Sequence, residues 1–133
     1  MKVVLDTNIL ISAIGWEGKP RVILEKCLDN RFRLATSHQI LAEVCQVLAR
    51  KKFSFIDKTI RDEFIMLLSG LAEIVNPREK INICRDKEDN KFIEAALAAK
   101  ADHIVTGDYD LLEIKKYGGI RILSADEFLR SLR

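Results

Sequence analysis

Hydrophobic and polar positions follow changing patterns along this chain, and the first pattern is the most informative. Val3, Val4 and Leu5 form a continuous apolar run, which is typical of a strand buried on both faces of a parallel sheet. Asp6 follows directly, so it stands at the carboxyl end of the strand, where open α/β sheets place their ligand sites. Because a buried unpaired charge is very costly, this carboxylate needs a cation, a helix N-terminus or backbone donors.

Apolar periodicity predicts the remaining elements. Further strands are expected at residues 31–35, 72–75, 103–106 and 120–123. Helices are expected at residues 9–14, 20–29, 36–51, 54–70, 89–100 and 111–116, and from Ser124 onward. Residues 81–84 fit a loop and an edge strand equally well. Strands that alternate with helices predict an α/β fold with a parallel sheet, in a single domain spanning residues 1–133.

Several helix boundaries are marked by capping residues. Pro20 suits the first position of a helix, because its missing N–H would be unpaired there in any case. Thr36, Ser54 and Ser124 each precede an acidic or amide side chain by three residues, which is the spacing of a capping box. Gly70 is expected as the C-cap of the helix that begins near Ser54.

The composition is that of a globular domain. The chain has 133 residues, of which 48% are apolar and 32% are charged, enough for a sizeable core. A net charge of +2 does not indicate a strongly basic nucleic-acid binder, although a local basic patch could still bind phosphate. No apolar run approaches the roughly 20 residues of a membrane span, so no membrane association is expected.

The cellular setting is predicted from the N-terminus and the cysteines. The charge at Asp6 comes too early for a secretory signal sequence. Cys27, Cys45 and Cys84 are odd in number, far apart and set in apolar surroundings. They are therefore expected to be reduced thiols in or near the core of a cytoplasmic protein. None of them has the spacing of a zinc-ligand pair.

Three more acidic residues are predicted to lie near Asp6. Asp108 follows a later strand, and the carboxyl ends of parallel strands point to the same edge of a sheet. At about 100° per residue, Glu43 lies at the edge of the apolar face of its helix. Asp89 lies within the apolar face of another helix, whereas Glu94 lies on the opposite side and is expected to point toward water.

Each of these acids alone also has a structural explanation. Asp89 is more readily an N-cap or a helix-dipole partner, and Asp108 a turn residue. Glu43 is a helix-edge acid, although Val47 at the i+4 position offers it no cation. Together, four acids in one cleft repel one another unless cations are present. A site made only of oxygen ligands favours Mg²⁺ or Mn²⁺ over zinc.

Four segments in a fixed order carry a family resemblance. They are Val3–Asn8, Leu41–Val44, Asp86–Ala96 and Ala101–Asp108. No single segment is decisive, but their order and spacing are specific, and with them the chain resembles a small PIN domain over nearly its full length. The subgroup that it resembles most consists of VapC-like toxin components of bacterial and archaeal toxin–antitoxin pairs.

The resemblance implies a metal-dependent ribonuclease with a three-layer fold, in which a central twisted parallel sheet lies between helices. The residues that match the acidic set of the family, and would hold Mg²⁺ or Mn²⁺, are Asp6, Glu43, Asp89 and Asp108. Thr106 would hydrogen-bond near the first aspartate, and Asn8 would brace the strand–helix turn. The helical-face argument selects Asp89, and Asp86 is the alternative.

The implied chemistry is hydrolysis of a phosphodiester. A metal held by Asp6, with Asp89 and Asp108 beside it, would polarise the phosphate and lower the pKa of a bound water. Glu43 would complete the metal shell or orient that water; one ion and two ions are both compatible with this set. Cations must offset the repulsion between the carboxylates and RNA, and the candidates are Lys19, Arg21, Lys51, Lys52, Arg85, Lys87 and Lys91. Trp16 would stack on a base or pack within the protein.

Three functional hypotheses follow. The first is a divalent-metal-dependent endoribonuclease, the toxin of a toxin–antitoxin pair that a cognate antitoxin restrains. The second is a catalytically silent PIN-fold module that binds RNA or protein. The third, a phosphate-receiving receiver-like domain, fits poorly because it needs two adjacent acids where only Asp6 stands. The sequence also leaves open whether the protein forms a homodimer, since the apolar helix around residues 64–68 could pack against a second copy or against the core.

Overall fold

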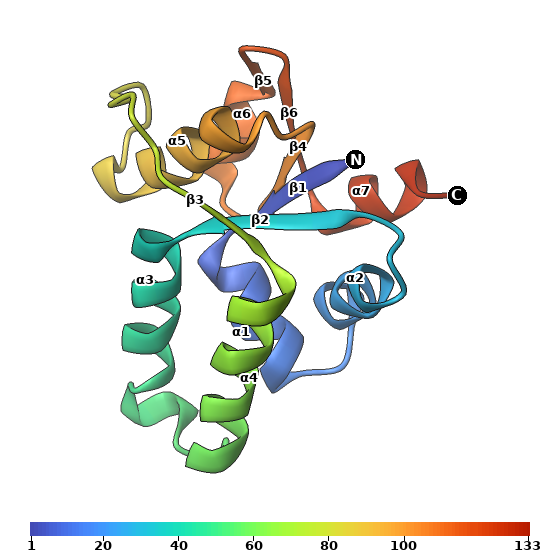
Figure 1. Cartoon of the computed structure of the whole chain (residues 1–133), viewed down its shortest axis with the longest axis vertical. Helices are drawn as coiled ribbons and strands as arrows, with labels where there is room; N and C mark the ends of the chain where they lie inside the picture. The colour runs from blue at the N-terminus through green and yellow to red at the C-terminus, as the bar shows by residue number, and fades with distance from the viewer.

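Six strands form one sheet at the centre of the structure, a computed structural model that describes residues 1–133 (Figure 1). The strands are β1 (Lys2–Leu5), β2 (Arg33–Ser37), β3 (Glu73–Val75), β4 (His103–Val105), β5 (Lys116–Tyr117) and β6 (Ile120–Leu123). Their order across the sheet is β3-β2-β1-β4-β6-β5. All neighbouring pairs are parallel except β5–β6. The expected α/β fold with a mostly parallel central sheet is confirmed.

Helices cover both faces of this sheet. They are α1 (Thr7–Gly15), α2 (Lys19–Leu28), α3 (His38–Leu48), α4 (Lys58–Leu71), α5 (Asn90–Ala99), α6 (Tyr109–Ile114) and α7 (Ala125–Ser131). Two short 3₁₀ helices, η1 (Lys51–Phe53) and η2 (Lys87–Asp89), precede α4 and α5. In Figure 1, α5 and α6 lie above the sheet and α1 to α4 lie below it, which gives three layers. No helix is long and apolar enough to cross a lipid bilayer.

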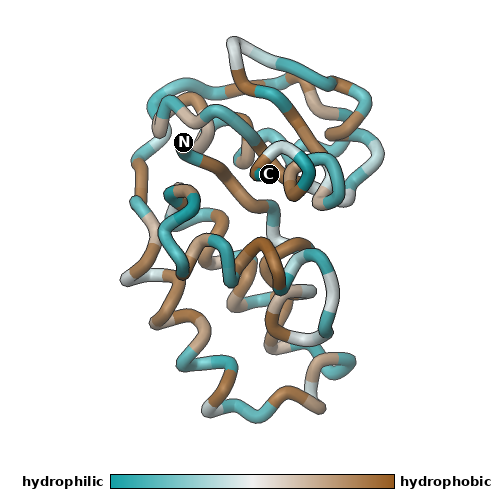
Figure 2. The backbone as a smooth tube through the Cα atoms, turned by 90° about the vertical axis from the view of Figure 1, so that its right-hand side faces the viewer, coloured by the Kyte–Doolittle hydropathy of each residue, from teal (hydrophilic) through white to brown (hydrophobic).

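Burial of β1 sets the centre of the fold. Val3, Val4 and Leu5 are at most 1% exposed, and the tube in Figure 2 is brown along this strand and turns teal where the strand ends. Helix α5 packs across β1, β2, β3 and β4, with the small side chains of Ala95 and Ala96 fully buried. A strand that is covered on both faces is what the continuous apolar run predicted.

Strand β2 lies two residues later than predicted, and this moves the start of α3. Asn30 adopts a left-handed conformation with a φ of 60°, so the chain is still turning after α2. The strand therefore begins at Arg33 and continues through Thr36. Ser37, rather than Thr36, is the N-cap of α3, and its hydroxyl accepts the Ile40 N–H at 3.2 Å.

The boundaries of α4 also differ from the prediction. Asp57, not Ser54, is its N-cap, and the Asp57 carboxylate accepts the Thr59 N–H at 2.9 Å. Gly70 lies inside the last turn rather than at the C-cap. The helix ends at Ala72 in an extended conformation, with φ −85° and ψ 147°, so no left-handed glycine is needed there.

The C-terminal part contains one unpredicted strand and one confirmed cap. Strand β5 pairs antiparallel with β6 through a two-residue turn at Gly118 and Gly119, whose φ angles of 54° and 86° favour glycine. With only two residues, β5 is too short to show an alternating pattern. The capping box of Ser124 and Glu127 is present at the start of α7. Residues 81–84 form a loop.

The three cysteines are free thiols in different environments. Cys27 is buried and Cys84 is half-buried, as expected, but Cys45 is exposed on α3. The expectation of a core or near-core position was wrong for Cys45, because the apolar residues next to it in the sequence lie on the buried face of α3 and Cys45 itself does not.

Replacing Gly119 by alanine is expected to lower the free energy of unfolding by about 1 kcal/mol, because an L-residue is strained at a φ of 86°. Gly70→Ala is the matched control. Its Cβ would meet nothing within 4 Å, and in a helix alanine should stabilise by roughly 0.5–1 kcal/mol. Urea denaturation of both variants measures the difference, and effects of the same sign would contradict the turn geometry.

Candidate active site

The carboxyl ends of β1 and β4 lie side by side, because these two strands pair in parallel. A cleft of about 220 Å³ opens at this edge of the sheet. The residues that line it, which we call the acidic cleft, are Asp6, Thr7, Asn8, Glu43, Val47, Arg50, Asp86, Glu88, Asp89, Phe92 and Asp108. The four acidic residues selected from the sequence therefore lie in one cleft, together with two further acids.

Asp6 is 3% exposed and is held from two elements. Its Oδ1 accepts the Ile9 N–H at 2.8 Å, so this carboxylate is the N-cap of α1, and a helix N-terminus is one of the three partners expected for it from the sequence. Its Oδ2 accepts the hydroxyl hydrogen of Thr106, at the end of β4. Burial raises the pKa of Asp6 to about 6 although the bonds from Thr106 and Ile9 lower it, and the charge of Asp108 adds to the rise.

Asp89 is the last residue of η2, directly before α5, and it lines the acidic cleft. Its side chain makes no capping hydrogen bond, so the N-cap explanation does not apply to it. The residue is 9% exposed, and its Oδ2 is buried without a hydrogen-bond partner. Burial raises the pKa of Asp89 to about 7, and the adjoining carboxyl group of Asp108 and the charges of Asp86 and Asp6 add to the rise. Such a carboxylate is costly unless a cation or a proton compensates it.

Two neighbouring acids lie differently. Asp86 is exposed at the rim of the cleft, where its Oδ1 caps η2 by accepting the Glu88 N–H at 3.0 Å. Glu94 does not line the cleft, but it is half-buried and its Oε2 accepts the Ile81 N–H at 2.9 Å. Glu94 therefore lies away from the cleft, as its place on the opposite side of the helix predicted, but it is only partly exposed. Asp89 is the deeper of the two candidate aspartates.

Glu43 is bonded through both of its carboxylate oxygens. Its Oε1 accepts the Thr7 hydroxyl hydrogen, and its Oε2 accepts a hydrogen of the Lys91 ammonium at 2.6 Å. The side chain of Lys91 is only 4% exposed and also lies 3.2 Å from Glu88. Burial disfavours the charged ammonium, but the hydrogen bonds and charges of the two glutamates outweigh it and raise the pKa of Lys91. The cation that Glu43 lacks on its own helix thus comes from α5.

The burial of Lys91 corrects the set of cations expected to meet RNA. Because its ammonium is enclosed between two glutamates, Lys91 does not present a charge to the solvent. Lys19 and Arg85 lie within salt-bridge distance of acidic side chains, and Arg21 donates to backbone carbonyls of α1. Arg50, which the sequence reading had passed over, is exposed and lines the acidic cleft.

The carboxylate oxygens in the acidic cleft are suitable ligands for a divalent cation in both atom type and charge. Carboxylate oxygens suit Mg²⁺ and Mn²⁺, and the unpartnered Oδ2 of Asp89 marks unmatched negative charge. However, no group of three His, Cys, Asp or Glu side chains lies at the spacing of a metal site. Asp89 and Asp108 nevertheless lie close enough for the Asp108 carboxyl group to raise the pKa of Asp89.

Asn8 lies differently from its expectation, whereas Trp16 follows one of the two alternatives given for it. Asn8 is exposed at the cleft, while the carboxylate of Asp6 braces the strand–helix turn. Trp16 packs edge-on against Phe53 and Phe55, with ring centroids 6.1 and 5.7 Å apart. Because Asp6 and Trp16 are the two caps that flank the nine residues of α1, Trp16 stands roughly 15 Å along the helix axis from Asp6, at 1.5 Å per residue. Packing within the protein is therefore the role that the structure supports for Trp16.

The fold and the acidic cleft agree with the result of comparing the sequence with known protein families. Residues 2–110 match the model of the PIN domain family, and the chain belongs to this family. An uncharacterized protein from Methanocaldococcus jannaschii is 37% identical over 118 residues, which cover 86% of this chain and 76% of that protein.

Solved structures share the fold. VapBC2 from Rickettsia felis, bound to a DNA fragment from its promoter, matches with a TM-score of 0.62 and 21% identity over 93% of this chain and 98% of the other. PAE2754 from Pyrobaculum aerophilum matches with a TM-score of 0.68 and 16% identity over 99% and 89% of the two chains. VapBC-1 from nontypeable Haemophilus influenzae matches with a TM-score of 0.60 and 19% identity over 95% and 99%.

Without divalent cations, the stability of the protein is expected to fall as the pH rises from about 4 to about 7. Between the ordinary value of 3.8 and the raised pKa values of Asp6 and Asp89, the folded state binds more protons than the unfolded state. The rise for Asp6 alone corresponds to about 3 kcal/mol. Urea denaturation in EDTA across this range measures the effect, and Asp6→Asn should flatten the curve. An equal slope in that variant would refute the buried charge.

Lys91→Met is expected to destabilise the protein by about 3 kcal/mol, because it leaves two glutamates without their cation in a partly buried site. Lys87→Met, four residues earlier on the surface, is the matched control and should change stability by less than about 0.5 kcal/mol. Thermal and urea unfolding of both variants measure this. Similar values for the two lysines would show that the Glu43–Lys91 pair is not structural.

Proposed function

We propose that this chain is a divalent-metal-dependent endoribonuclease that hydrolyses RNA phosphodiester bonds and acts as the toxin of a toxin–antitoxin pair. The observation that carries the nuclease proposal is the buried, unpartnered carboxylate of Asp89, in one cleft with Asp6 and Asp108. Membership of the PIN domain family supports the same activity. Two of the proteins with a similar fold are VapBC complexes, which supports the toxin assignment.

Asp6, Asp89 and Asp108 are the residues proposed to hold Mg²⁺ or Mn²⁺, with Glu43 at the edge of the site. A bound divalent cation supplies Lewis-acid polarisation of a phosphodiester and lowers the pKa of a nearby water. The protein's own part is orientation. Thr106 donates to Asp6 and also accepts the Asp108 N–H at 2.9 Å, so one hydroxyl links both aspartates.

Glu43 is proposed to orient a water molecule, and not to be one of the main metal ligands. Its two oxygens are bonded to Thr7 and Lys91, and each carboxylate oxygen keeps a second lone pair for a water. Lys91 fixes the position of the Glu43 carboxylate through the bond at 2.6 Å. Arg50 at the mouth of the cleft is proposed to contact a substrate phosphate.

A partner protein is part of the proposal. A toxin of this kind is restrained by a cognate antitoxin, and the acidic cleft would accept a basic side chain of such a partner as readily as a metal ion. A homodimer is proposed through α4, which buries Phe64 and Leu68 but leaves Ile60, Met66 and Leu67 between 41% and 73% exposed.

Two observations favour the alternative, a catalytically silent PIN-fold module that binds RNA or protein. No three acidic side chains lie at metal-binding spacing, and Glu43 is already satisfied by Lys91. Titration calorimetry with Mn²⁺ separates the two functions. Binding that is lost in Asp89→Asn supports the nuclease, whereas no binding at millimolar Mn²⁺ supports the silent module.

Asp6→Asn is expected to reduce Mg²⁺-dependent cleavage of an RNA substrate by at least about 100-fold, since it removes one metal-ligand charge. The fold should persist, because asparagine also caps helices well. Asp102→Asn is the matched control. Asp102 flanks the same two strands at their amino ends, where its Oδ2 accepts the Lys2 N–H at 3.0 Å. Gel-based cleavage assays measure both, and full activity of Asp6→Asn would refute the assignment.

A further inference from the structure

A second concave surface adjoins the acidic cleft. It has a volume of about 330 Å³ and lies between the segment 76–81 and the start of α5. Its polar lining includes Gln39, Arg78, Lys80, Lys87, Asn90 and Lys91, and we call it the basic groove. Residues 86–91 form the wall between the two surfaces: Asp86, Glu88 and Asp89 line the cleft, and Lys87, Asn90 and Lys91 line the groove.

The sheet order explains why the two surfaces lie next to each other. The cleft forms where β1 and β4 end, and the groove forms where β3 runs into the segment 76–81 and β2 runs into α3. All four strands are parallel neighbours, so their carboxyl ends share one edge. Three strand spacings of about 4.8 Å make this edge roughly 14 Å long.

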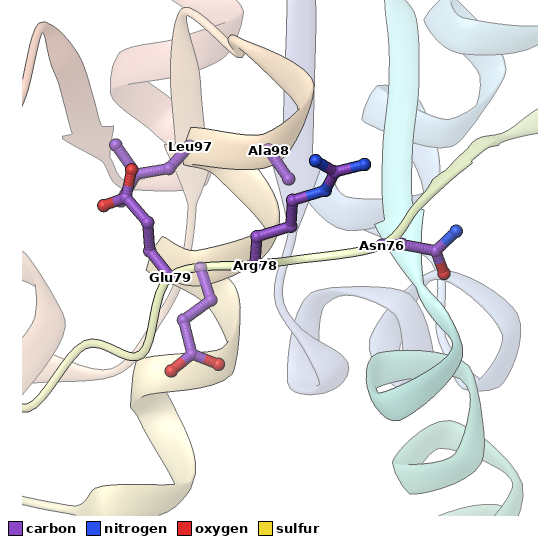
Figure 3. A pocket seen from close by; sticks show the side chains of 6 residues that line it. Asn76, Arg78, Glu79, Leu97 and Ala98 are labelled. Carbon is purple, nitrogen blue, oxygen red and sulfur yellow. The ribbon is translucent and has the colours of Figure 1, made fainter.

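The groove carries unpaired positive charge. Arg78, Lys80 and Lys87 are exposed, and none of them takes part in a salt bridge within the chain. Figure 3 shows Arg78 extending from the segment 76–81 toward Ala98 of α5, in a pocket of about 230 Å³ that shares lining residues with the groove. Two acids also line the groove: Glu79 is exposed, and Glu94 accepts the Ile81 N–H through its Oε2.

The charge changes sign across the wall. Six acidic side chains and a single arginine line the cleft, so the cleft by itself repels a nucleic-acid backbone. Lys91, at the wall, is already neutralised by Glu43 and Glu88. The exposed cations beside the wall are therefore the ones positioned to attract a phosphate backbone to this edge of the sheet.

The groove has no surface for base recognition by stacking. None of its lining residues is aromatic, and only one is hydrophobic. Stacking on aromatic side chains is the usual way in which proteins hold unpaired bases. Contacts in the groove would thus be with phosphates, which position a strand without reading its sequence.

We infer that the basic groove binds the sugar-phosphate backbone of the RNA strand on one side of the bond that lies in the acidic cleft, through Arg78, Lys80 and Lys87. The identity of the strand rests on the proposed nuclease function. Binding in the groove is salt-dependent and independent of base sequence. It sets the direction in which a substrate lies, from the ends of β1 and β4 toward the end of β3.

The test measures binding without cleavage. In an Asp6→Asn background, Arg78, Lys80 and Lys87 are each changed to glutamine, and the affinity for a labelled single-stranded RNA of about 14 nucleotides is measured by fluorescence anisotropy. The matched control changes Arg33, Lys116 and Arg133 to glutamine; these are also exposed, and they line neither surface. Circular dichroism and thermal unfolding verify that both variants fold, and single Lys87→Gln is made in addition.

The groove variant is expected to bind at least about tenfold more weakly, while the control is unchanged. The slope of log affinity against log salt should become shallower by about 2, at roughly 0.7 for each of three phosphate contacts on a single strand. The loss should be the same for RNAs of different base sequence.

Other outcomes overturn the inference. These are wild-type affinity in the groove variant, equal losses in groove and control variants, or no RNA binding by the unmodified chain. Wild-type RNA affinity combined with loss of a protein partner would assign the groove to that partner instead. A cleavage assay on the unmodified chain is run separately: RNA that is bound through the groove but not cut refutes the nuclease proposal and leaves the groove standing.

Discussion

The burial of one carboxylate, that of Asp6, is the constraint on which the rest of the site depends. It lies at the end of the central strand and is 3% exposed, yet it carries a charge at neutral pH only at a cost. The structure reduces this cost with two hydrogen bonds, from the first turn of α1 and from Thr106 after β4. The same bonds join the strand, the helix and the neighbouring strand at the point where the cleft opens. The Asp6 carboxylate therefore both positions the elements around the cleft and contributes to its negative charge.

The other acids of the cleft are balanced unequally. Glu43 receives an internal cation, Lys91, and a hydroxyl from Thr7, so its charge is matched within the fold. Asp89 receives neither, and its raised pKa follows from burial and from Asp108 beside it. The charge of Glu43, on one side of the cleft, is thus neutralised by Lys91. The carboxyl groups on the other side, those of Asp6, Asp89 and Asp108, form no salt bridge with a cation of the protein. The negative charge that the fold leaves unmatched is therefore concentrated on this other side, and this asymmetry is more informative than the number of acids.

Much of the fold could be read from local patterns, and the errors have identifiable causes. The apolar run at β1, the inward face of α5 and the capping box at Ser124 are local signals, and all three appear in the structure. Thr36 and Ser54 also had capping-box spacing, but the turn at Asn30 shifted one helix start to Ser37 and the 3₁₀ turn before α4 moved the other to Asp57. Spacing alone does not show which of several possible caps is used.

What the sequence determined by itself was the carboxyl-edge position of Asp6 and the inward direction of Asp89, because strand ends and helix faces follow from periods of two and 3.6 residues. What only the tertiary structure decided was the pairing of charges between elements. Lys91 looked like a cation for RNA, yet it is buried against Glu43 from a helix 48 residues away in sequence. Arg78 and Lys80 were not among the cations selected from the sequence, yet they line a groove beside the cleft. Such charge pairs and shared surfaces depend on how α3, α5 and the segment after β3 pack together. The spacing of residues within one helix or strand carries no information about this packing.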